Sequence, residues 1–374
     1  MEVDYLVVGS GLTGGTIARC LADRGERVLI VDRRPHVGGN VHDHKHASGI
    51  RIHTYGPHYF RTSSDRIWAF VNRFDRFYRY EPVLMTQVDG ALEYWPIQGE
   101  YIDRTVGADW TPSFTGTPEN FEEASLAIMP QPIYEKFIRG YNVKQWGIDP
   151  RALETGLAGR FDVRTDGEKR LKTSPHQGIP VSGYAGLMSN LVAGIPTLTG
   201  VDYRLVRNAF TVRKRTIYTG PIDELFDYDL GKLAYRGQKR EHSYFPDADY
   251  RQPVGQVNTP GLDQGPQVRI LEWKHMMAED ERARAVGTVL TTETPFTPTD
   301  PNEYEYPFPD SRNRELFKRY QSRLAGMSDL LVCGRLGEYR YYDMDQAIGR
   351  ALMLVERVLL PGATGAETVA LMAA

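Results

Sequence analysis

The first 39 residues constrain the fold more than any other stretch of this chain. An apolar run over residues 4–8 is typical of a buried parallel strand. The turn after it carries Gly9, Gly11 and Gly14 at G-x-G-x-x-G spacing, and a helix and a second strand are expected before Asp32. This order predicts a βαβ unit that binds a dinucleotide, with the phosphates at the helix N-terminus and a ribose at the acid.

The βαβ unit alone does not distinguish FAD from NAD. Arg33 and Arg34 follow the acid, and Gly38 and Gly39 form a second glycine pair. By resemblance to flavoproteins with two dinucleotide-binding domains, where such a pair abuts the pyrophosphate, these residues favour FAD.

Composition narrows the class of protein. A chain of 374 residues predicts two or three domains, and a net charge of −3 gives no footprint for nucleic-acid binding. No apolar run approaches the roughly 20 residues that cross a bilayer. The first strand begins at once, which leaves no room for a signal peptide, and the two cysteines are interpreted as buried hydrophobic residues. We therefore expect a cytoplasmic protein with no membrane partner.

The middle of the chain is interpreted as alternating helices and strands. His42, His44 and His46 have no Cys or Glu at ligand spacing, so we expect a solvated loop and no metal site. The other expected elements are helices over 64–78, 116–146, 310–324 and 345–359, a hairpin over 79–98, a mobile loop over 164–178, strands within 201–245 and 266–276, a connector over 295–309 and a buried strand over 330–334.

The buried strand at 330–334 runs into a second glycine turn and a helix. This repeats the opening pattern, so a dinucleotide held at Gly9–Gly14 would be clamped at its other end from near Gly337. The alternative is an ordinary strand–loop–helix with aromatic filling.

Several segments together resemble the UDP-galactopyranose mutase family, and they occur in order along the whole chain. They are Gly38-Gly39-Asn40, Tyr55-Gly56-Pro57-His58, YNVKQWG at 141–147, QGIP at 177–180, YTGPID at 218–223, RILEWKH at 269–275 and GRLGEYRYYDMD at 334–345. The resemblance implies an α/β fold with a Rossmann-like FAD-binding domain, an inserted helical domain and an antiparallel β-sheet domain. The expected boundaries are 1–78 with 201–245 and 325–374 for the first, 100–200 for the second, and 79–99 with 246–324 for the third.

The resemblance also implies an activity. Members interconvert the pyranose and furanose forms of a nucleotide-diphosphate sugar: N5 of reduced FAD attacks the anomeric carbon, the nucleoside diphosphate leaves, an iminium forms and the ring recloses. No net redox change occurs. The implied partners are a sugar on a pyrimidine nucleotide and an external reductant such as NAD(P)H, and the chain would be a monomer or a homodimer. The alternatives are a flavin oxidoreductase of the amine-oxidase class and a flavin- or nucleotide-binding protein without catalysis.

The implied cofactor contacts come from both ends of the chain. They are Gly9, Gly11, Leu12, Thr13, Gly14, Asp32, Arg33, Gly39, Asn40, Tyr55, Gly56, Arg61, Gly334, Arg335, Arg340, Asp343 and Met344. His58 is expected against the isoalloxazine.

The implied catalytic and substrate contacts are arginines and aromatic residues. Arg160 and Arg269 would hold the diphosphate, with Arg236 as a third candidate, because a guanidinium fork binds phosphate oxygens and stays charged. Tyr341 and Tyr306 would donate hydrogen bonds to the phosphates, and Asp343 would lie near the sugar. By the resemblance, Phe137, Tyr141 and Trp146 would form the wall on which a uracil stacks, although their spacing taken alone is more typical of a core stripe.

Two positions depart from the family pattern. The family's mobile loop carries a Tyr-Phe pair where this chain has Leu171-Lys172, so Lys172 would replace a lost tyrosine contact with a cation. The family's Gly-Pro-His-x-Phe-His-Thr has Arg61 in place of its second histidine. A permanent cation near the flavin would favour its anionic reduced form and contact a different sugar substituent. We therefore expect a mutase whose sugar is not necessarily galactose.

Overall fold

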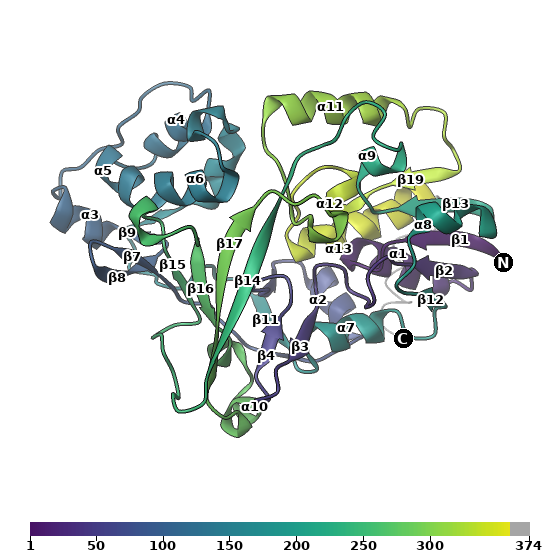
Figure 1. Ribbon diagram of the computed structural model, residues 1–374, viewed down its shortest axis with the longest axis horizontal. Helices are drawn as coiled ribbons and strands as arrows, with labels where there is room; N and C mark the ends of the chain where they lie inside the picture. The colour runs from purple at the N-terminus through teal and green to yellow at the C-terminus, as the bar shows by residue number, and fades with distance from the viewer. Residues whose placement is uncertain (360–374) are drawn as a thin grey trace.

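The predicted βαβ unit belongs to a parallel sheet on the right of Figure 1. The computed structural model describes residues 1–359. The elements of this region are β1 (Glu2–Val8), α1 (Leu12–Ala22), β2 (Val28–Val31), β12 (Thr197–Leu198), β13 (Thr211–Tyr218) and β19 (Leu330–Val332). The strand order is β12-β2-β1-β13-β19, and all neighbours pair in parallel. Strands from distant parts of the chain therefore end at one edge of the same sheet.

Two helices hold α1 against this sheet: α7 (Gly183–Leu191) and α13 (Met344–Leu354). Ile17 of α1 is buried in one apolar cluster with Leu187 of α7 and Leu352 of α13. Full burial of each such side chain contributes about 1.5–3 kcal/mol. This packing fixes the N-terminus of α1 at the sheet edge.

A second sheet has seven strands in the order β18-β14-β17-β16-β15-β7-β8, and its long strands cross the middle of Figure 1. Its strands are β7 (Leu84–Val88), β8 (Ala91–Trp95), β14 (Tyr235–Phe245), β15 (Gln256–Asn258), β16 (Arg269–Glu272), β17 (Thr288–Phe296) and β18 (Tyr306–Pro307). β7 and β8 form the predicted hairpin, with positive φ at both Asp89 (52°) and Gly90 (77°).

Short helices gather beyond β7 and β8, at the upper left of Figure 1. They are α3 (Gly99–Thr105), α4 (Phe121–Leu126), α5 (Gln131–Tyr134), a π-helical turn (Glu135–Arg139) and α6 (Gly140–Trp146). Phe121, Ile133 and Phe137 belong to an apolar cluster of their own. α6 ends at Gly147, whose φ of 71° closes the helix with a left-handed residue.

The remaining elements are short. They are β3 (Asp43–Lys45), β4 (Arg51–His53), β5 (Phe60–Thr62), β6 (Phe77–Tyr78), β9 (Ile97–Gln98), β10 (Val163–Arg164), β11 (His176–Pro180), α2 (Asp65–Asn72), α8 (Tyr203–Val206), α9 (Ile222–Leu225), α10 (Glu279–Arg284), α11 (Ser311–Ser322) and α12 (Gly334–Gly337). Within residues 1–359, no helix has the length and apolar character needed to cross a membrane. The same residues contain no group of three or more His, Cys, Asp or Glu side chains that could hold a metal ion.

Three of the predicted segments differ in the structure. The histidine loop at 42–46 instead forms β3, because a turn closed by the hydrogen bond from His46 N–H to Ile50 O pairs it with β4. The Pro-rich connector contains β18, which adds to the free edge of β14, where a strand tolerates proline. The strand at 330–334 is only half-buried, because β19 is the edge of its sheet.

Two predicted elements are shorter than expected. The helix at 64–78 is capped by Ser64, whose hydroxyl accepts from Ile67 N–H at 3.3 Å, but it ends at Asn72 and the chain continues into β6. The strand pattern at 201–245 is interrupted by α8, which Asp202 caps through Arg204 N–H. The three-domain division stays a prediction, and its last residues, 360–374, lie outside the described part of the chain.

Candidate functional site

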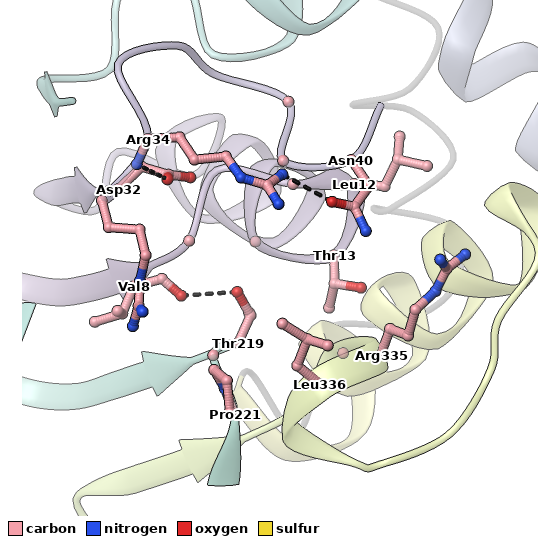
Figure 2. Close-up of a pocket in the computed structure, with 18 of the residues that line it drawn as sticks. Val8, Leu12, Thr13, Asp32, Arg34, Asn40, Thr219, Pro221, Arg335 and Leu336 are labelled. Atoms are coloured by element: carbon pink, nitrogen blue, oxygen red, sulfur yellow. Dashed lines mark hydrogen bonds between the residues drawn. The ribbon is translucent and has the colours of Figure 1, made fainter. Parts of the chain in front are cut away.

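A cavity opens at the carboxyl ends of β1, β2 and β13, and we call it the strand-end cavity (Figure 2). Figure 2 shows Asp32, Arg34 and Asn40 on one side and Arg335 and Leu336 of α12 on another. The predicted cofactor contacts that line it are Gly9, Gly11, Leu12, Thr13, Gly14, Asp32, Arg33, Gly39, Asn40, Gly334, Arg335 and Met344. The carboxyl ends of parallel strands are where nucleotides bind in sheets of this kind.

Backbone forms the floor of the strand-end cavity. Gly9 has a φ of 99°, and a Cβ there would lie 2.0 Å from Thr219 Oγ1. A Cβ on Gly14 would lie 2.0 Å from Gly9 O, so only glycine lets α1 begin this close to the turn. No side chain caps the N-terminus of α1, whose first turn carries no acid. These free N–H groups fit the pyrophosphate of a dinucleotide.

The acid at the end of β2 is held in place by hydrogen bonds. Asp32 is buried; its Oδ2 accepts from Ser10 N–H at 2.7 Å and Ser10 Oγ–H at 2.6 Å, and its Oδ1 accepts from Arg34 N–H at 2.9 Å. The Arg34 guanidinium donates to Asn40 Oδ1 at 2.8 Å and lies 4.2 Å from the centre of the Tyr55 ring. A fixed carboxylate at this position fits a ribose hydroxyl pair.

Arg33 lines the same cavity, but its charge is already paired. Its guanidinium makes two hydrogen bonds to the fully buried carboxylate of Glu224, and Arg204 lies 3.2 Å from the same carboxylate. Neither Glu224 nor Arg204 is part of the sequence prediction, because nothing in their local pattern marks them.

A second cavity continues from the first, and we call it the arginine cavity. The two share Asn40, His58, Arg335 and Met344 as lining residues. The predicted residues that line the arginine cavity, apart from these four, are Tyr55, Gly56, Arg61, Phe137, Tyr141, Trp146, Arg160, Lys172, Arg269, Tyr306, Tyr341 and Asp343. Residues from distant parts of the sequence therefore meet around one space.

Tyr341 stands at the centre of a cationic and aromatic group in this cavity. The Arg160 guanidinium lies 3.9 Å from its ring centre, and that of Arg335 lies 4.6 Å away. Tyr306 stacks on it with the ring centres 6.1 Å apart and the planes 9° apart. Cation–π contacts at such distances help to hold the guanidiniums in place. Arg335 is also held by its hydrogen bonds to Glu305 O at 3.1 Å and Tyr342 O at 2.7 Å.

Arg269 lies over a buried network that the sequence analysis missed. Its Nε donates to Glu293, which also accepts from Arg240 Nε at 2.7 Å, and Arg240 forms a two-point pair with Glu305 at 2.7 and 2.9 Å. Burial alone would raise the pKa of Glu293, but the Arg269 and Arg240 guanidiniums hold it below its usual value. Burial raises the pKa of Glu305 despite its pairing with Arg240.

This network explains how the largely buried strand at 269–272 can contain an arginine. An unpaired guanidinium there would be costly to bury, and Glu293 of the neighbouring strand β17 supplies the partner. Arg240 and Glu293 could not be identified from the sequence as members of this network. Each occupies what is, in the sequence, an ordinary polar position of a strand with alternating polar and apolar residues.

His58 lies where the two cavities meet. Burial, together with His53 and Arg335, lowers the pKa of His58 to about 3, so its ring is neutral near pH 7. Its Nδ1 lies 2.7 Å from Gly56 O. Because a carbonyl only accepts, Nδ1 carries the proton and Nε2 keeps its lone pair.

The aromatic wall and a set of amides line the other end of the arginine cavity. Phe137 and Trp146 are mostly buried in the helical part of the molecule, which agrees with the core alternative, yet both also line the cavity with Tyr141. The amides belong to Gln256 and Asn258 of β15, and Asn258 Oδ1 accepts a hydrogen bond from Gln256 Nε2 at 2.9 Å. The amides were not part of the prediction.

Arg61 and Asp343 form an ion pair of 3.1 Å at the cavity wall, with side chains 29% and 39% exposed. Both are predicted site residues, and the structure brings them together. Leu171 and Lys172 of the predicted mobile loop also line this cavity.

Two predicted contacts lie elsewhere, and we correct them. Arg236 lines neither cavity; it donates to Gln145 O at 2.6 Å, Lys144 O at 3.1 Å and Thr297 Oγ1 at 2.6 Å. It therefore caps the C-terminal carbonyls of α6. Arg340 is exposed after the turn at Tyr339, and its guanidinium lies 5.6 Å from the Tyr342 ring centre, outside both cavities.

Family models and known proteins match this chain. A family model described as UDP-galactopyranose mutase matches residues 136–341, and a model described as an NAD(P)-binding Rossmann-like domain matches residues 7–74. The dTDP-fucopyranose mutase of Escherichia coli is 30% identical over 93% of this chain and 96% of its own. The probable UDP-galactopyranose mutase of Klebsiella pneumoniae is 29% identical over 95% of this chain and 94% of its own.

Solved structures of other proteins share this fold. A crystal structure of reduced UDP-galactopyranose mutase superposes with a TM-score of 0.75 at 16% identity, covering 99% of this chain and 97% of that one. The α/β architecture with a Rossmann-like unit is therefore confirmed.

Proposed function

Because the chain belongs to the UDP-galactopyranose mutase family, we propose that it interconverts the pyranose and furanose forms of a sugar carried on a nucleoside diphosphate. Such a reaction is an isomerisation with no net electron transfer. The observation that carries the proposal is the junction of the two cavities at Asn40, His58, Arg335 and Met344. One cavity has the backbone of a dinucleotide site, and the other has the cations and rings that a nucleotide sugar needs.

The dinucleotide in this proposal is FAD, active in its reduced form. When bound, a reduced flavin would supply a nucleophilic nitrogen for chemistry at the anomeric carbon. The N-terminus of α1, with Gly9 and Gly11, would hold the pyrophosphate, and Asp32 would hold the ribose. The residues shared by both cavities would border the ring.

The arginine cavity would receive the diphosphate as it leaves the sugar. Arg160, Arg269 and Lys172, which line the same cavity, would bind its oxygens, and the hydroxyls of Tyr306 and Tyr341 would donate to the same oxygens. Fixed cations in a water-excluded cavity stabilise departing negative charge without reorganising. Because Arg269 is held by Glu293, it would not need to move during the reaction.

The sugar and the base would lie at opposite ends of this cavity. Arg61 and Asp343 would contact sugar oxygens next to the cofactor, and neutral His58 would accept a hydrogen bond at Nε2. At the other end a pyrimidine would stack on the wall of Phe137, Tyr141 and Trp146. An external reductant such as NAD(P)H would reduce the cofactor. The protein would act as a monomer or a homodimer.

The test is incubation of the dithionite-reduced protein with UDP-galactopyranose, dTDP-fucopyranose and other pyrimidine nucleotide sugars, with the products separated by ring form. dTDP-fucopyranose is included because of the name of the 30% identical relative. We expect a furanose product from at least one sugar, many turnovers for each equivalent of reductant, and no oxygen consumption in step with turnover. Stoichiometric oxygen uptake with an oxidised product would instead indicate an oxidoreductase.

A further inference from the structure

The loop between β10 and β11 closes around one guanidinium. Arg164 donates from Nη1 to Arg170 O at 2.9 Å and Glu168 O at 3.5 Å, and from Nη2 to Leu171 O at 3.2 Å. Its Nε donates to Asp162 Oδ2 at 3.0 Å, and the side chain is only 12% exposed. A single side chain thus binds backbone carbonyls across the loop.

The outside of the same loop rests on the segment that leads into β7. Leu171 N–H donates to Pro82 O at 2.8 Å, and Arg170 forms an isolated antiparallel bridge with Val83. Arg170 Nη1 also pairs with Glu81 Oε1 at 3.0 Å. Arg164 holds the loop from inside, while residues 81–83 hold it from outside.

The other contacts of the loop are made at Glu168 and Lys169. The Glu168 carboxylate accepts from Arg170 N–H at 2.8 Å and Nε at 2.9 Å, and the Glu168 carbonyl also accepts from Gln98 Nε2 at 3.4 Å. Lys169 Nζ lies 4.4 Å from the centre of the Tyr94 ring.

Residues 165–167 and 169 of the loop are exposed, and Gly167 adopts a φ of 74°. Carbonyls in such a segment otherwise bond to water and leave the backbone free to move. Arg164 holds the carbonyl of Leu171, which is the residue directly before Lys172. The two residues share a peptide group, and Lys172 lines the arginine cavity with Arg160 and Arg269.

We propose that Arg164 is a positioning residue, which sets Lys172 in the wall of the arginine cavity by holding the carbonyls of Glu168, Arg170 and Leu171. The inference rests on the proposed function, in which Lys172 binds the nucleoside diphosphate. Arg164 lines neither cavity and acts only through the loop. Arginine suits this role because its fork of donors spans several carbonyls at once.

The test is a double-mutant cycle on FAD-loaded protein, with the Kd of UDP measured by calorimetry. Lys172→Ala and Arg164→Gln should each raise the Kd by about tenfold, the loss expected for a hydrogen bond to a charged group. The double variant should bind no more weakly than Lys172→Ala alone, because Arg164 then has nothing to position. Independent losses, about hundredfold in the double variant, would overturn the inference, as would a wild-type Kd in either single variant.

A matched control is Arg151→Gln, since Arg151 bonds from Nε to the Asp two residues before it, as Arg164 does, but its side chain is 66% exposed. This variant should bind UDP as the wild type does. If Arg164→Gln does not fold, Arg164→Lys should weaken UDP binding in the wild-type background and leave Lys172→Ala unchanged; equal weakening in both overturns the inference. A wild-type protein that binds neither UDP nor dTDP would contradict the proposed function itself.

Discussion

The two cavities of this protein are adjacent but are built in different ways. The strand-end cavity is formed largely by backbone: Gly9 follows β1, Gly14 lies in the first turn of α1 and Gly334 follows β19. The arginine cavity is formed by side chains, and Arg269 in its wall belongs to an ionic network with the buried Glu293 and Glu305 and with Arg240, whose side chain is 9% exposed. The first depends on space for close approach, whereas the second depends on balanced charge.

This difference determines how each region should fail. At Gly14 in the backbone-built cavity, an added Cβ causes a steric clash that no side-chain movement can relieve, because the atom it meets, Gly9 O, is itself backbone. A change of charge in the side-chain-built cavity leaves its shape almost unaltered. It also leaves the remaining ion buried without a partner of opposite charge. Substitutions can therefore remove one property while leaving the other.

The largest expected effect is that of Gly14→Ala. Its Cβ would lie 2.0 Å from Gly9 O, so α1 cannot keep its position at the turn. We expect protein that purifies without flavin and therefore has no mutase activity. The measurement is the ratio of absorbance near 450 nm to that at 280 nm, and Gly156→Ala is the control because no atom lies within 4 Å of its added Cβ.

Glu293→Gln should break the second region alone. It removes the buried charge between Arg240 and Arg269, and such losses cost about 3–5 kcal/mol. We expect this decrease in the free energy of unfolding, measured by urea titration, with flavin still bound in the folded protein. Loss of flavin without loss of stability would mean that the two cavities do not differ in the way described here.

The same difference explains what could be read from the sequence. Glycine spacing, a buried strand and a terminal acid are local patterns, so the strand-end cavity and the residues around Gly9, Asp32 and Gly334 were predictable. Arg269 was singled out because it interrupts an apolar strand.

The partners of Arg269 were not predictable, because Glu293 and Arg240 become neighbours only through the pairing of β14, β16 and β17. Arg236 was predicted from the family resemblance, which says nothing of the α6 carbonyls that it binds. Buried networks of side chains depend on long-range register, which a single sequence does not display.

Arg160→Ala tests whether the charged wall serves the nucleotide and not the cofactor. Removal of a guanidinium that binds phosphate costs about 2–3 kcal/mol, or roughly 30- to 150-fold in the Kd of UDP. Flavin content should not change. The control is Arg104→Ala, because Arg104 also lies over a tyrosine ring, 4.7 Å from that of Tyr101, but on an exposed surface.

His58 lies where the two cavities meet, and its low pKa makes the stability of the protein depend on pH. Its pKa of about 3 in the folded protein lies below the ordinary value of about 6.5 expected after unfolding. Between these values the unfolded chain takes up a proton that the folded one does not, so stability is full above pH 6.5 and falls as the pH decreases. We expect a loss of about 2 kcal/mol from pH 7 to pH 5 that His58→Gln removes from the urea-derived profile. Identical pH slopes for both proteins would contradict this.

The smallest effect is expected for Arg61→His, which restores the residue typical of the family. The Arg61–Asp343 pair is partly exposed, so its loss should cost about 1 kcal/mol or less in stability, in contrast to Glu293. Its consequence should be a change in preference: the ratio of kcat/KM for UDP-galactopyranose to that for dTDP-fucopyranose should shift by about tenfold or less, because only the contact with one part of the sugar changes. Equal changes for both sugars would place the pair outside sugar recognition, and the ion pair would then serve only to hold the start of α13 against β5.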